Sequence, residues 1–329
     1  MTTYKGIRGL TIQTVAGDAS PLIAGDIWYN SSSKKIKGAK IAAGAWATSD
    51  DMGTARLDAA GPASAGTSTA GLVFGGAIPP APTASANSEE YNGSAWAEGN
   101  NLGTARYLGM GAGTQTAALM GGGHNGTAGV ANSEEYDGTS WAEGNDMSQV
   151  QSHHSGCGTQ TAGFSFGGYA GGAKVAESEN YDGTSWTEGT AANTARAAGA
   201  GLGLATAALW VGGDKHPSAI VAQTESFDGS SWTEVGDLTA ANYRGGAAGT
   251  QAQAISIDGV PPFNTSEEWD GSSWTAAANM NLSKHSEFGL GSGTSALGGG
   301  GYQPVSPAGH RVTTEEWSKA LAAVTFTSS

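Results

Sequence analysis

Six glutamates recur in one short context: serine or threonine, the glutamate, any residue, then an aromatic side chain. Carboxylates at a regular spacing can act as general acids or bases, or lie buried beside cations and backbone N–H groups. Each glutamate stands two residues before its aromatic neighbour, so both side chains point to one face of a strand. Because every repeat carries the motif, we interpret it as a buried structural ring. The six are Glu89, Glu134, Glu179, Glu225, Glu267 and Glu315.

Basic residues near the start of the repeats are the expected partners of these carboxylates. They are Arg56, Arg106, Arg196 and Arg244, and the third and sixth repeats carry Gln151 and Lys284 instead. A functional charge ring would require the glutamates to face an open channel. Arginine or backbone N–H partners inside each repeat are the interpretation that we prefer.

His153, His154 and Cys157 form the one local cluster with the residue types of a metal site. Structural zinc usually takes four ligands, and the sequence offers no second pair at a suitable spacing. We therefore predict no metal and no cofactor, and we interpret the cluster as a variation of one strand.

Known catalytic motifs do not fit the chain. The Tyr-Asp-Gly-Thr-Ser-Trp stretch at Tyr136 lacks the residue that a sialidase Asp box places between aspartate and glycine. A copper site like that of galactose oxidase needs a cysteine–tyrosine pair with histidine ligands, and Cys157 is the single cysteine. A Gly-x-x-x-x-Gly-Lys-Ser/Thr phosphate loop does not occur. The sequence predicts that the protein is not an enzyme.

Aromatic residues set the period of the elements that position these side chains. Six tryptophans recur at intervals of 42 to 50 residues: Trp46, Trp96, Trp141, Trp186, Trp232 and Trp274. Another aromatic residue stands five positions before each of the last five: Tyr91, Tyr136, Tyr181, Phe227 and Trp269. A period in the forties with paired aromatic residues is typical of the blades of a β-propeller.

Each repeat contains four short strand-like runs separated by turns. The first run is rich in glycine and alanine, and an Asn-Gly or Asp-Gly turn joins the third run to the fourth. The second run ends in a glycine pair, assigned to Gly75-Gly76, Gly121-Gly122, Gly167-Gly168, Gly212-Gly213 and Gly298-Gly299. The fifth repeat departs from this pattern with Asp258-Gly259.

These features resemble the kelch repeat, which combines an arginine-bearing first strand, a glycine doublet and a closely spaced tyrosine and tryptophan. The resemblance covers about residues 46 to 317. The uniform wording of the repeats is also similar to kelch-like repeats of marine bacteriophage virion proteins. The resemblance to the kelch repeat implies an all-β fold, a six-bladed kelch-like β-propeller over residues 46–318. The unpaired strand around Trp46 is expected to complete the last blade and close the ring.

Residues 1–45 and 319–329 lie outside the repeats. The stretch from Gly25 to Gly38 predicts two strands around a polar turn. It is similar to amino-terminal segments of phage fibre and appendage proteins, which implies attachment to the particle or formation of a trimer. An ordinary β-hairpin leading into the propeller is the alternative. Residues 319–329 are expected to form an extra strand or a docking tail.

Composition limits the partners. The 329 residues include 54 glycines and carry a formal charge of −14, which disfavours nucleic acid as a partner. The only basic cluster is Lys34, Lys35, Lys37 and Lys40. The start of the chain does not read as a signal peptide, and no run of about 18 apolar residues occurs. We expect synthesis in a cytoplasm and no membrane insertion.

The loops that join the second and third runs differ most between repeats. All six are expected on one face of the propeller, where exposed aromatic and polar side chains suit contact with carbohydrate or protein. Drift in unconstrained loops is the alternative. The candidate binding residues are His124, Asn125, Tyr169, Asp214, His216, Phe263, Asn264, Tyr302, His310 and Arg311.

The resemblance implies a virion structural protein, a tail fibre or appendage that presents these loops to a host-surface glycan or protein. Residues 1–45 would bind other virion proteins and support a homo-oligomer such as a trimer. A capsid or tail decoration protein without receptor binding is the first alternative. A cellular kelch-type adaptor and a carbohydrate-active propeller enzyme are further alternatives.

Overall fold

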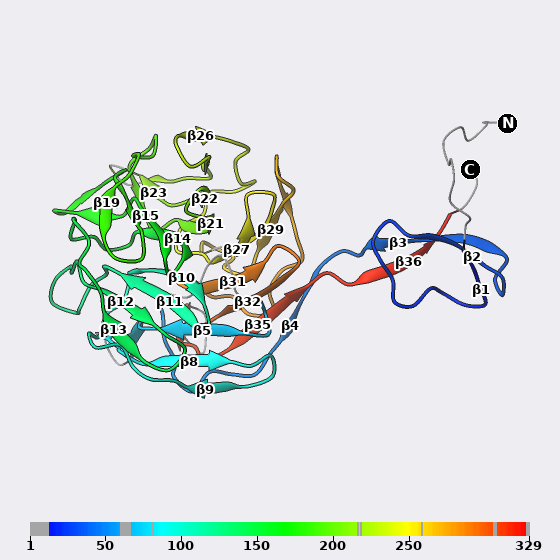
Figure 1. The fold of residues 1–329 in the computed structure, drawn as a ribbon, viewed down its shortest axis with the longest axis horizontal. Coiled ribbons are helices and arrows are strands. Elements are labelled where there is room, and N and C mark those ends of the chain that lie inside the picture. Colours follow the sequence, from blue (N-terminus) through cyan, green and yellow to red (C-terminus); the bar gives the residue numbers. More distant parts are fainter. Residues whose placement is uncertain are drawn as a thin grey trace. The chain divides into compact units, whose positions relative to one another are not determined.

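The computed structural model describes residues 13–59, 67–79, 82–215, 217, 219–257, 259–304 and 308–326, and these form strands and turns without a helix. The predicted all-β class is confirmed. The chain divides into two compact units: a small unit of residues 1–44 and 319–329, and a large unit of residues 45–318. Residues 319–329 thus belong with the amino-terminal segment (Figure 1). Since the described part holds no helix, it holds none long and apolar enough to cross a membrane.

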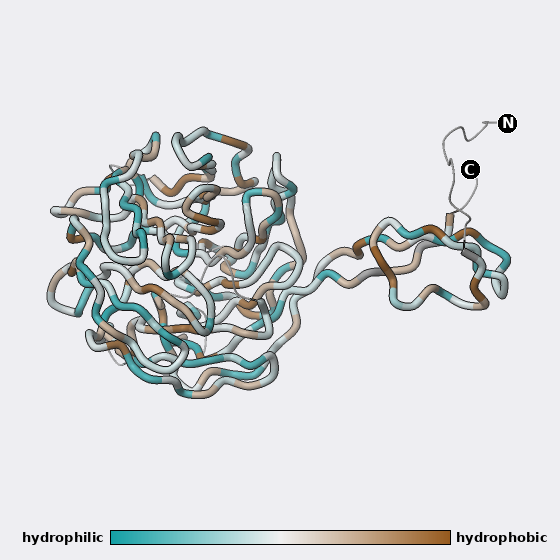
Figure 2. The backbone as a smooth tube through the Cα atoms, viewed as in Figure 1, coloured by the Kyte–Doolittle hydropathy of each residue, from teal (hydrophilic) through white to brown (hydrophobic). Residues whose placement is uncertain are grey.

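The small unit is one four-stranded sheet in the order β1-β2-β3-β36. Its strands are β1 (Gln13–Val15), β2 (Ile27–Asn30), β3 (Lys35–Ile41) and β36 (Leu321–Thr325). Strands β2, β3 and β36 pair antiparallel, and β1 runs parallel to β2. Lysine and apolar residues alternate at the start of β3, whereas β36 is mostly apolar (Figure 2). Trp28 on β2 is buried, with 1% of its surface exposed.

The large unit contains six antiparallel sheets that follow the repeats. The first is β5 (Gly71–Phe74), β8 (Ser88–Tyr91) and β9 (Trp96–Glu98). The second is β10 (Met110–Thr114), β11 (Ala117–Gly121), β12 (Ser133–Tyr136) and β13 (Trp141–Glu143). The third is β14 (Ser155–Thr159), β15 (Ala162–Phe166), β18 (Ser178–Tyr181) and β19 (Trp186–Glu188).

The remaining three sheets repeat this arrangement. The fourth is β21 (Ala200–Leu204), β22 (Ala207–Val211), β25 (Thr224–Phe227) and β26 (Trp232–Glu234). The fifth is β27 (Ala247–Thr250), β28 (Gln253–Ile257), β29 (Ser266–Trp269) and β30 (Trp274–Ala276). The sixth is β31 (Phe288–Ser292), β32 (Ser295–Gly299), β35 (Thr314–Ser318) and β4 (Ala45–Thr48). In this last sheet Trp46 lies opposite Trp317, so its outer strand comes from the other end of the chain.

Short strands lie in the connections between the second and third strands of the sheets. They are β6 (Ala77–Ile78) with β7 (Thr83–Ala84), β16 (Tyr169–Ala170) with β17 (Ala173–Lys174), and β33 (Tyr302–Gln303) with β34 (Gly309–His310). In the fourth repeat β20 (Arg196–Ala197), β23 (Asp214–Lys215) and β24 (Ala219–Ile220) form a three-stranded sheet.

The spacing of five between the two aromatic residues is the length of one hairpin. Tyr136 lies directly opposite Trp141, with ring centroids 5.1 Å apart. Asp137 closes the turn, because its Oδ1 accepts the backbone N–H groups of Thr139 at 2.8 Å and Ser140 at 2.7 Å. Gly138 has φ of 90°, a conformation that L side chains rarely adopt. Each Asx-Gly turn therefore presents an aromatic pair to the core.

A hydrophobic cluster joins each sheet to the next. Leu72 and Phe74 of β5 pack with Met120 of β11, and Leu202 of β21 packs with Trp269 of β29. The sixth sheet packs against the first in the same way, with Leu290 of β31 and Val73 of β5 in one cluster. Similar clusters join the second to the third, the third to the fourth and the fifth to the sixth sheet.

Two details of the predicted repeat were wrong. The glycine pairs with positive φ are Gly122-Gly123 in the second repeat and Gly300-Gly301 in the sixth, not Gly121-Gly122 and Gly298-Gly299. Both pairs lie in longer runs of glycine, so the sequence alone did not show which two glycines follow the second strand. Arg106 also lies before the regular strand of its repeat, since β10 begins only at Met110, and Arg196 lies in the short strand β20 rather than in β21.

Candidate functional site

Six residues with a left-handed backbone are joined in a cycle, and five of them precede the first strand of a sheet. We call them the inner ring: Asp58, Leu108, His153, Ala198, Arg244 and Ser286. Each donates its backbone N–H to the carbonyl of the ring residue in the preceding repeat, at 2.7–3.0 Å, and Asp58 donates to Ser286. The six hydrogen bonds return to their starting point.

The inner ring holds a backbone conformation that glycine would adopt with less strain. The φ values run from 52° to 61°, and these are six of the eight described non-glycine residues with positive φ. Such a conformation costs a non-glycine residue about 1 kcal/mol or more unless its surroundings fix it. The hydrogen-bonded cycle supplies that constraint.

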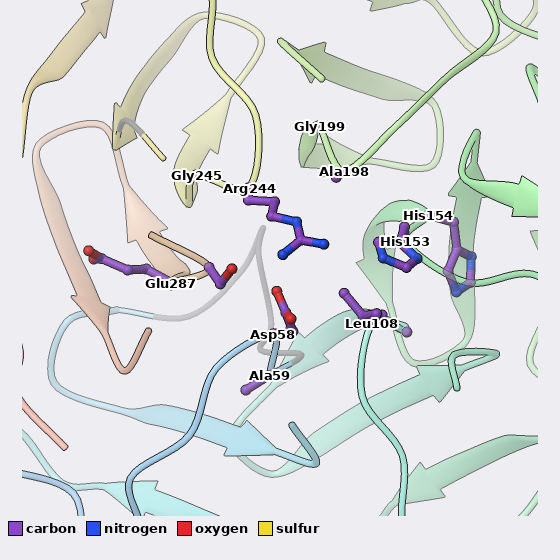
Figure 3. A pocket seen from close by; sticks show the side chains of 12 residues that line it. Asp58, Ala59, Leu108, His153, His154, Ala198, Gly199, Arg244, Gly245 and Glu287 are labelled. Carbon is purple, nitrogen blue, oxygen red and sulfur yellow. The ribbon is translucent and has the colours of Figure 1, made fainter. Parts of the chain in front are cut away.

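A cavity of about 100 Å³ is lined by the inner ring and the residue that follows each member, within the described part of the chain. A second cavity of about 110 Å³ shares six of these lining residues and reaches the first strands, where Gly111, Gly156 and Gly201 form part of its wall. Figure 3 shows the side chains of Asp58, Leu108, His153 and Arg244 directed into the first cavity.

Charged groups face each other across this cavity. The guanidinium of Arg244 extends toward Asp58 (Figure 3) and has neither an ion pair nor a side-chain hydrogen bond with any described residue. Its guanidinium carbon lies 5.8 Å from the centroid of the Tyr243 ring. Burial raises the pKa of Asp58, and Arg244 partly offsets the effect. Burial, Arg244 and His124 lower the pKa of His153 to about 4, so its imidazole is neutral at pH 7.

The six motif glutamates lie within the sheets and do not line the cavity. All are buried, and each accepts a backbone N–H at 2.6–2.8 Å. Glu134 also pairs with Arg106 at 2.9 Å, and equivalent pairs join Arg56 to Glu89 and Arg196 to Glu225. These contacts are those of a structural ring.

Arg244 does not take part in that ring, contrary to the sequence alignment of the repeats. Asn242 occupies the position of Arg106 and binds the carbonyl of Ile257 through its Nδ2, at 3.2 Å. Arg244 stands two residues later, at the position of Leu108 in the inner ring. The prediction was wrong because the fifth repeat has Asn242 in place of the arginine, and the nearest arginine, Arg244, lies two residues later.

The third and sixth repeats replace the buried arginine with smaller networks. His154 is buried, shares hydrogen bonds with Ser165 at 2.7 Å and the Gly121 carbonyl at 3.1 Å, and points away from the cavity (Figure 3). In the sixth repeat Glu287 approaches Lys284 at 3.8 Å, and burial raises the pKa of Glu287 to about 7.

Cys157 is buried and free, and the described residues contain no cluster of three or more metal-ligating side chains.

The predicted loops contact inner-ring residues or the residues that directly precede them in the sequence. Tyr107, just before Leu108, bridges to His124, with rings 5.3 Å apart. Tyr169 bridges to Ser152 and contacts the ring of His153 at 5.2 Å. The loop residues and the inner ring thus form one surface.

Three of the candidate loop residues gather around His285, which precedes Ser286. The ring of His285 lies 5.5 Å from Phe263 and 5.5 Å from Tyr302, and Tyr302 lies 5.8 Å from His310. Burial lowers the pKa of His285 and of His310.

The other candidates make internal contacts. Asp214 pairs with Lys174 at 2.6 Å, and Arg311 Nε donates to Gln303 at 2.7 Å. Asn125 closes its own turn by accepting the N–H groups of residues 127 and 128, and Asn264 donates to a carbonyl at residue 280. His216 lies outside the described residues.

Comparisons with known proteins show a similarity in fold and indicate no family or activity. No family model and no curated protein matches the chain. A solved structure of YjhT superposes with a TM-score of 0.66 at 10% sequence identity, covering 83% of this chain and 99% of that one. It is one of 243 solved chains that match. The propeller-like all-β fold is thereby supported, and a fold this widespread does not indicate an activity.

Proposed function

We propose that this chain is a structural protein of a bacteriophage particle, which attaches through its small unit and presents the loops of its large unit to a host-surface molecule. The resemblance of its repeats to those of phage virion proteins suggests the setting. One observation carries the mechanism: the chain separates two surfaces of different chemistry into two units. One surface suits permanent attachment and the other suits recognition.

We further infer that the six sheets are the blades of a closed six-bladed propeller. Three features support this inference. A hydrophobic cluster links the sixth sheet to the first, the inner-ring hydrogen bonds form a cycle, and β4 completes the sixth sheet on β35. Pairing of β4 with β35 covers the edge of β35 that another strand could otherwise join.

The small unit has an apolar sheet face. Tyr29 lies opposite Ile36, and Ile27 opposite Gly38, so these side chains share one face. A Cβ on Gly38 would lie 2.8 Å from the ring of Phe326, which places that ring across the same face. Ile27, Ile36 and Phe326 are 45%, 43% and 54% exposed. Such a face is typical of an interaction site.

Charge distinguishes the small unit from the large one. The small unit has seven basic and two acidic residues, a formal charge of +5, which leaves −19 on the large unit of the total −14. A basic, apolar surface suits an acidic virion protein, and complementary charge speeds such association. The same repulsive charge on two small units disfavours their pairing with each other, so a trimer would need contacts elsewhere.

The alternative role, a decoration protein without a receptor, also has support. Asn125, Asn264 and Arg311 are engaged in contacts within the chain, which reduces the number of loop residues available for a ligand. The two roles therefore differ in whether the surface around Tyr169, Phe263 and Tyr302 binds a host molecule.

The test uses particles that carry the full chain with Ile27→Ser and Ile36→Ser together. We expect the chain to be lost from purified particles, measured by quantitative mass spectrometry, while its melting temperature changes little. Ile220→Ser is the matched control, because Ile220 of the large unit is 43% exposed like Ile36. Full retention of the double variant would refute attachment through this face.

Host recognition is tested separately with the purified full chain. Labelled protein should bind host cells, and Tyr169→Ala with Tyr302→Ala should abolish that binding without affecting incorporation into particles. If the unaltered chain does not bind host cells, the decoration role replaces the receptor-binding role.

A further inference from the structure

The inner ring varies in chemistry although its backbone does not. All six repeats keep the motif glutamate and a tryptophan, and five keep the Asx-Gly turn. The six ring positions nevertheless carry six different side chains: Asp58, Leu108, His153, Ala198, Arg244 and Ser286. Their φ values differ by less than 10° and their hydrogen bonds are equivalent. Variation at six geometrically equal positions is what a recognition surface on a fixed frame requires.

Glycine is missing from the inner ring, although the positive φ of the ring positions favours it. The chain has 54 glycines, and many adopt positive φ elsewhere. A non-glycine residue at each ring position retains backbone strain that glycine would relieve. Strain that persists at a cavity is a feature of functional sites, where side chains are kept at a cost in stability.

Groups of both charges face this cavity. Arg244 offers N–H donors without a partner among the described residues, and Asp58 offers acceptor oxygens. The neutral imidazole of His153 shares a hydrogen bond with Ser152 through Nδ1 at 3.2 Å, which leaves its Nε2 for a ligand. The Ser286 hydroxyl is hydrogen-bonded to Asp58 and, at 3.1 Å, to His285 Nδ1. Donors and acceptors gathered at one opening match a ligand with several hydroxyl groups, each of which both donates and accepts.

From this arrangement, we infer that the inner ring binds the end of an uncharged saccharide. This inference rests on the proposed host recognition and names the site and the ligand class. The cavity of about 100 Å³ is smaller than the 300–1,000 Å³ pockets that enclose whole ligands, so only a terminal sugar enters it. The surrounding Tyr107, Tyr169 and Tyr302 supply aromatic faces for the rest of the chain of sugars.

The charge of the large unit disfavours an acidic saccharide as the ligand. A unit with a formal charge of −19 repels polyanionic glycans at moderate ionic strength, and Asp58 would face any carboxylate or sulfate that reached Arg244. An uncharged saccharide meets neither penalty.

The experiment compares the full chain with Arg244→Gly and Asp58→Gly on an array of uncharged, carboxylated and sulfated oligosaccharides. We expect the unaltered chain to bind uncharged saccharides and each variant to bind them at least 10-fold more weakly, the effect of removing a hydrogen bond to a charged group. Both variants should melt at the same temperature as the unaltered chain or higher, because glycine relieves the ring backbone. Ala198→Gly is the matched control and should bind normally.

Three results would overturn the inference: no binding to uncharged saccharides, preference for acidic ones, or unchanged binding by both variants. Cell binding separates this failure from that of the proposed function. If the unaltered chain and Arg244→Gly bind host cells equally, only the inner-ring site is refuted. If the unaltered chain does not bind cells, host recognition itself is refuted.

Discussion

The buried pair of Arg106 and Glu134 gives a quantitative test of what holds each repeat together. The Glu134 carboxylate accepts a hydrogen bond from Arg106 Nη2 at 2.9 Å and from the backbone of Gly103 at 2.6 Å and Thr104 at 3.2 Å. The side chains of Arg106 and Glu134 are 0% and 4% exposed. Glu134→Ala therefore leaves a guanidinium and two N–H groups without their acceptor.

The expected loss is large. Removing one partner of a buried ion pair costs about 3–5 kcal/mol, because the remaining charge stays desolvated. In a unit of this size each kcal/mol corresponds to roughly 2 °C in melting temperature, so Glu134→Ala should melt about 6–10 °C lower. Differential scanning calorimetry of the full chain measures the shift.

The third repeat provides the matched control. Glu179 accepts the backbone N–H groups of Ser148 at 2.7 Å and Gln149 at 3.0 Å, but Gln151 replaces the arginine. Glu179→Ala should cost only about 1–3 kcal/mol, the effect of unsatisfied hydrogen-bond donors. Adding Arg106→Leu to Glu134→Ala should recover part of the loss, since the unpaired charge is gone. Equal shifts for both glutamates, without recovery, would refute this reasoning.

Three further predictions concern single positions. Burial lowers the pKa of His154 to about 3, so the unfolded chain takes up a proton below pH 6.5 that the folded chain excludes, and stability falls as the pH drops from 6.5 toward 3; His154→Gln should flatten the slope of melting temperature against pH in this window. Gly113 has φ of 103°, and a Cβ there would collide with the carbonyl of Ala117, so Gly113→Ala should destabilise the large unit strongly, whereas Gly17→Ala, with open space around it, should not. Burial raises the pKa of the Cys157 thiol, so a thiol reagent at pH 8 should react only after denaturant is added; rapid reaction of the native chain would contradict this burial.

Regular features of the fold could be predicted because each has a short-range cause. The five-residue spacing from Tyr136 to Trp141 is the length of one hairpin, and the glycine of the Asx-Gly turn is required by its positive φ. The glutamates were recognisable because Glu134 stands in the same four residues as Glu89. Such features can be recognised in a single sequence because the same residues recur in several repeats.

The inner ring was not predictable for the opposite reason. Leu108, His153 and Arg244 are equivalent in the structure but share no chemistry, so no repeated letter marks their position. The only available signal was distance, two residues after the buried arginine, and the substitution of Asn242 removed that landmark in the fifth repeat. The loops near Tyr169 and Tyr302 were found as variable segments, but their contact with the ring depends on β-bridges between distant residues.

Both ends of the large unit are held by strand pairing that continues into the small unit. Ser318 pairs with Ala45, Ala42 donates its backbone N–H to Ala320, and Ile41 pairs with Leu321. A single protease cut in any loop of the large unit would therefore release neither fragment, because each would keep one strand in the β4–β35 pair and one in the β3–β36 pair. Backbone pairing between the two chain ends would therefore hold the two fragments together after a cut.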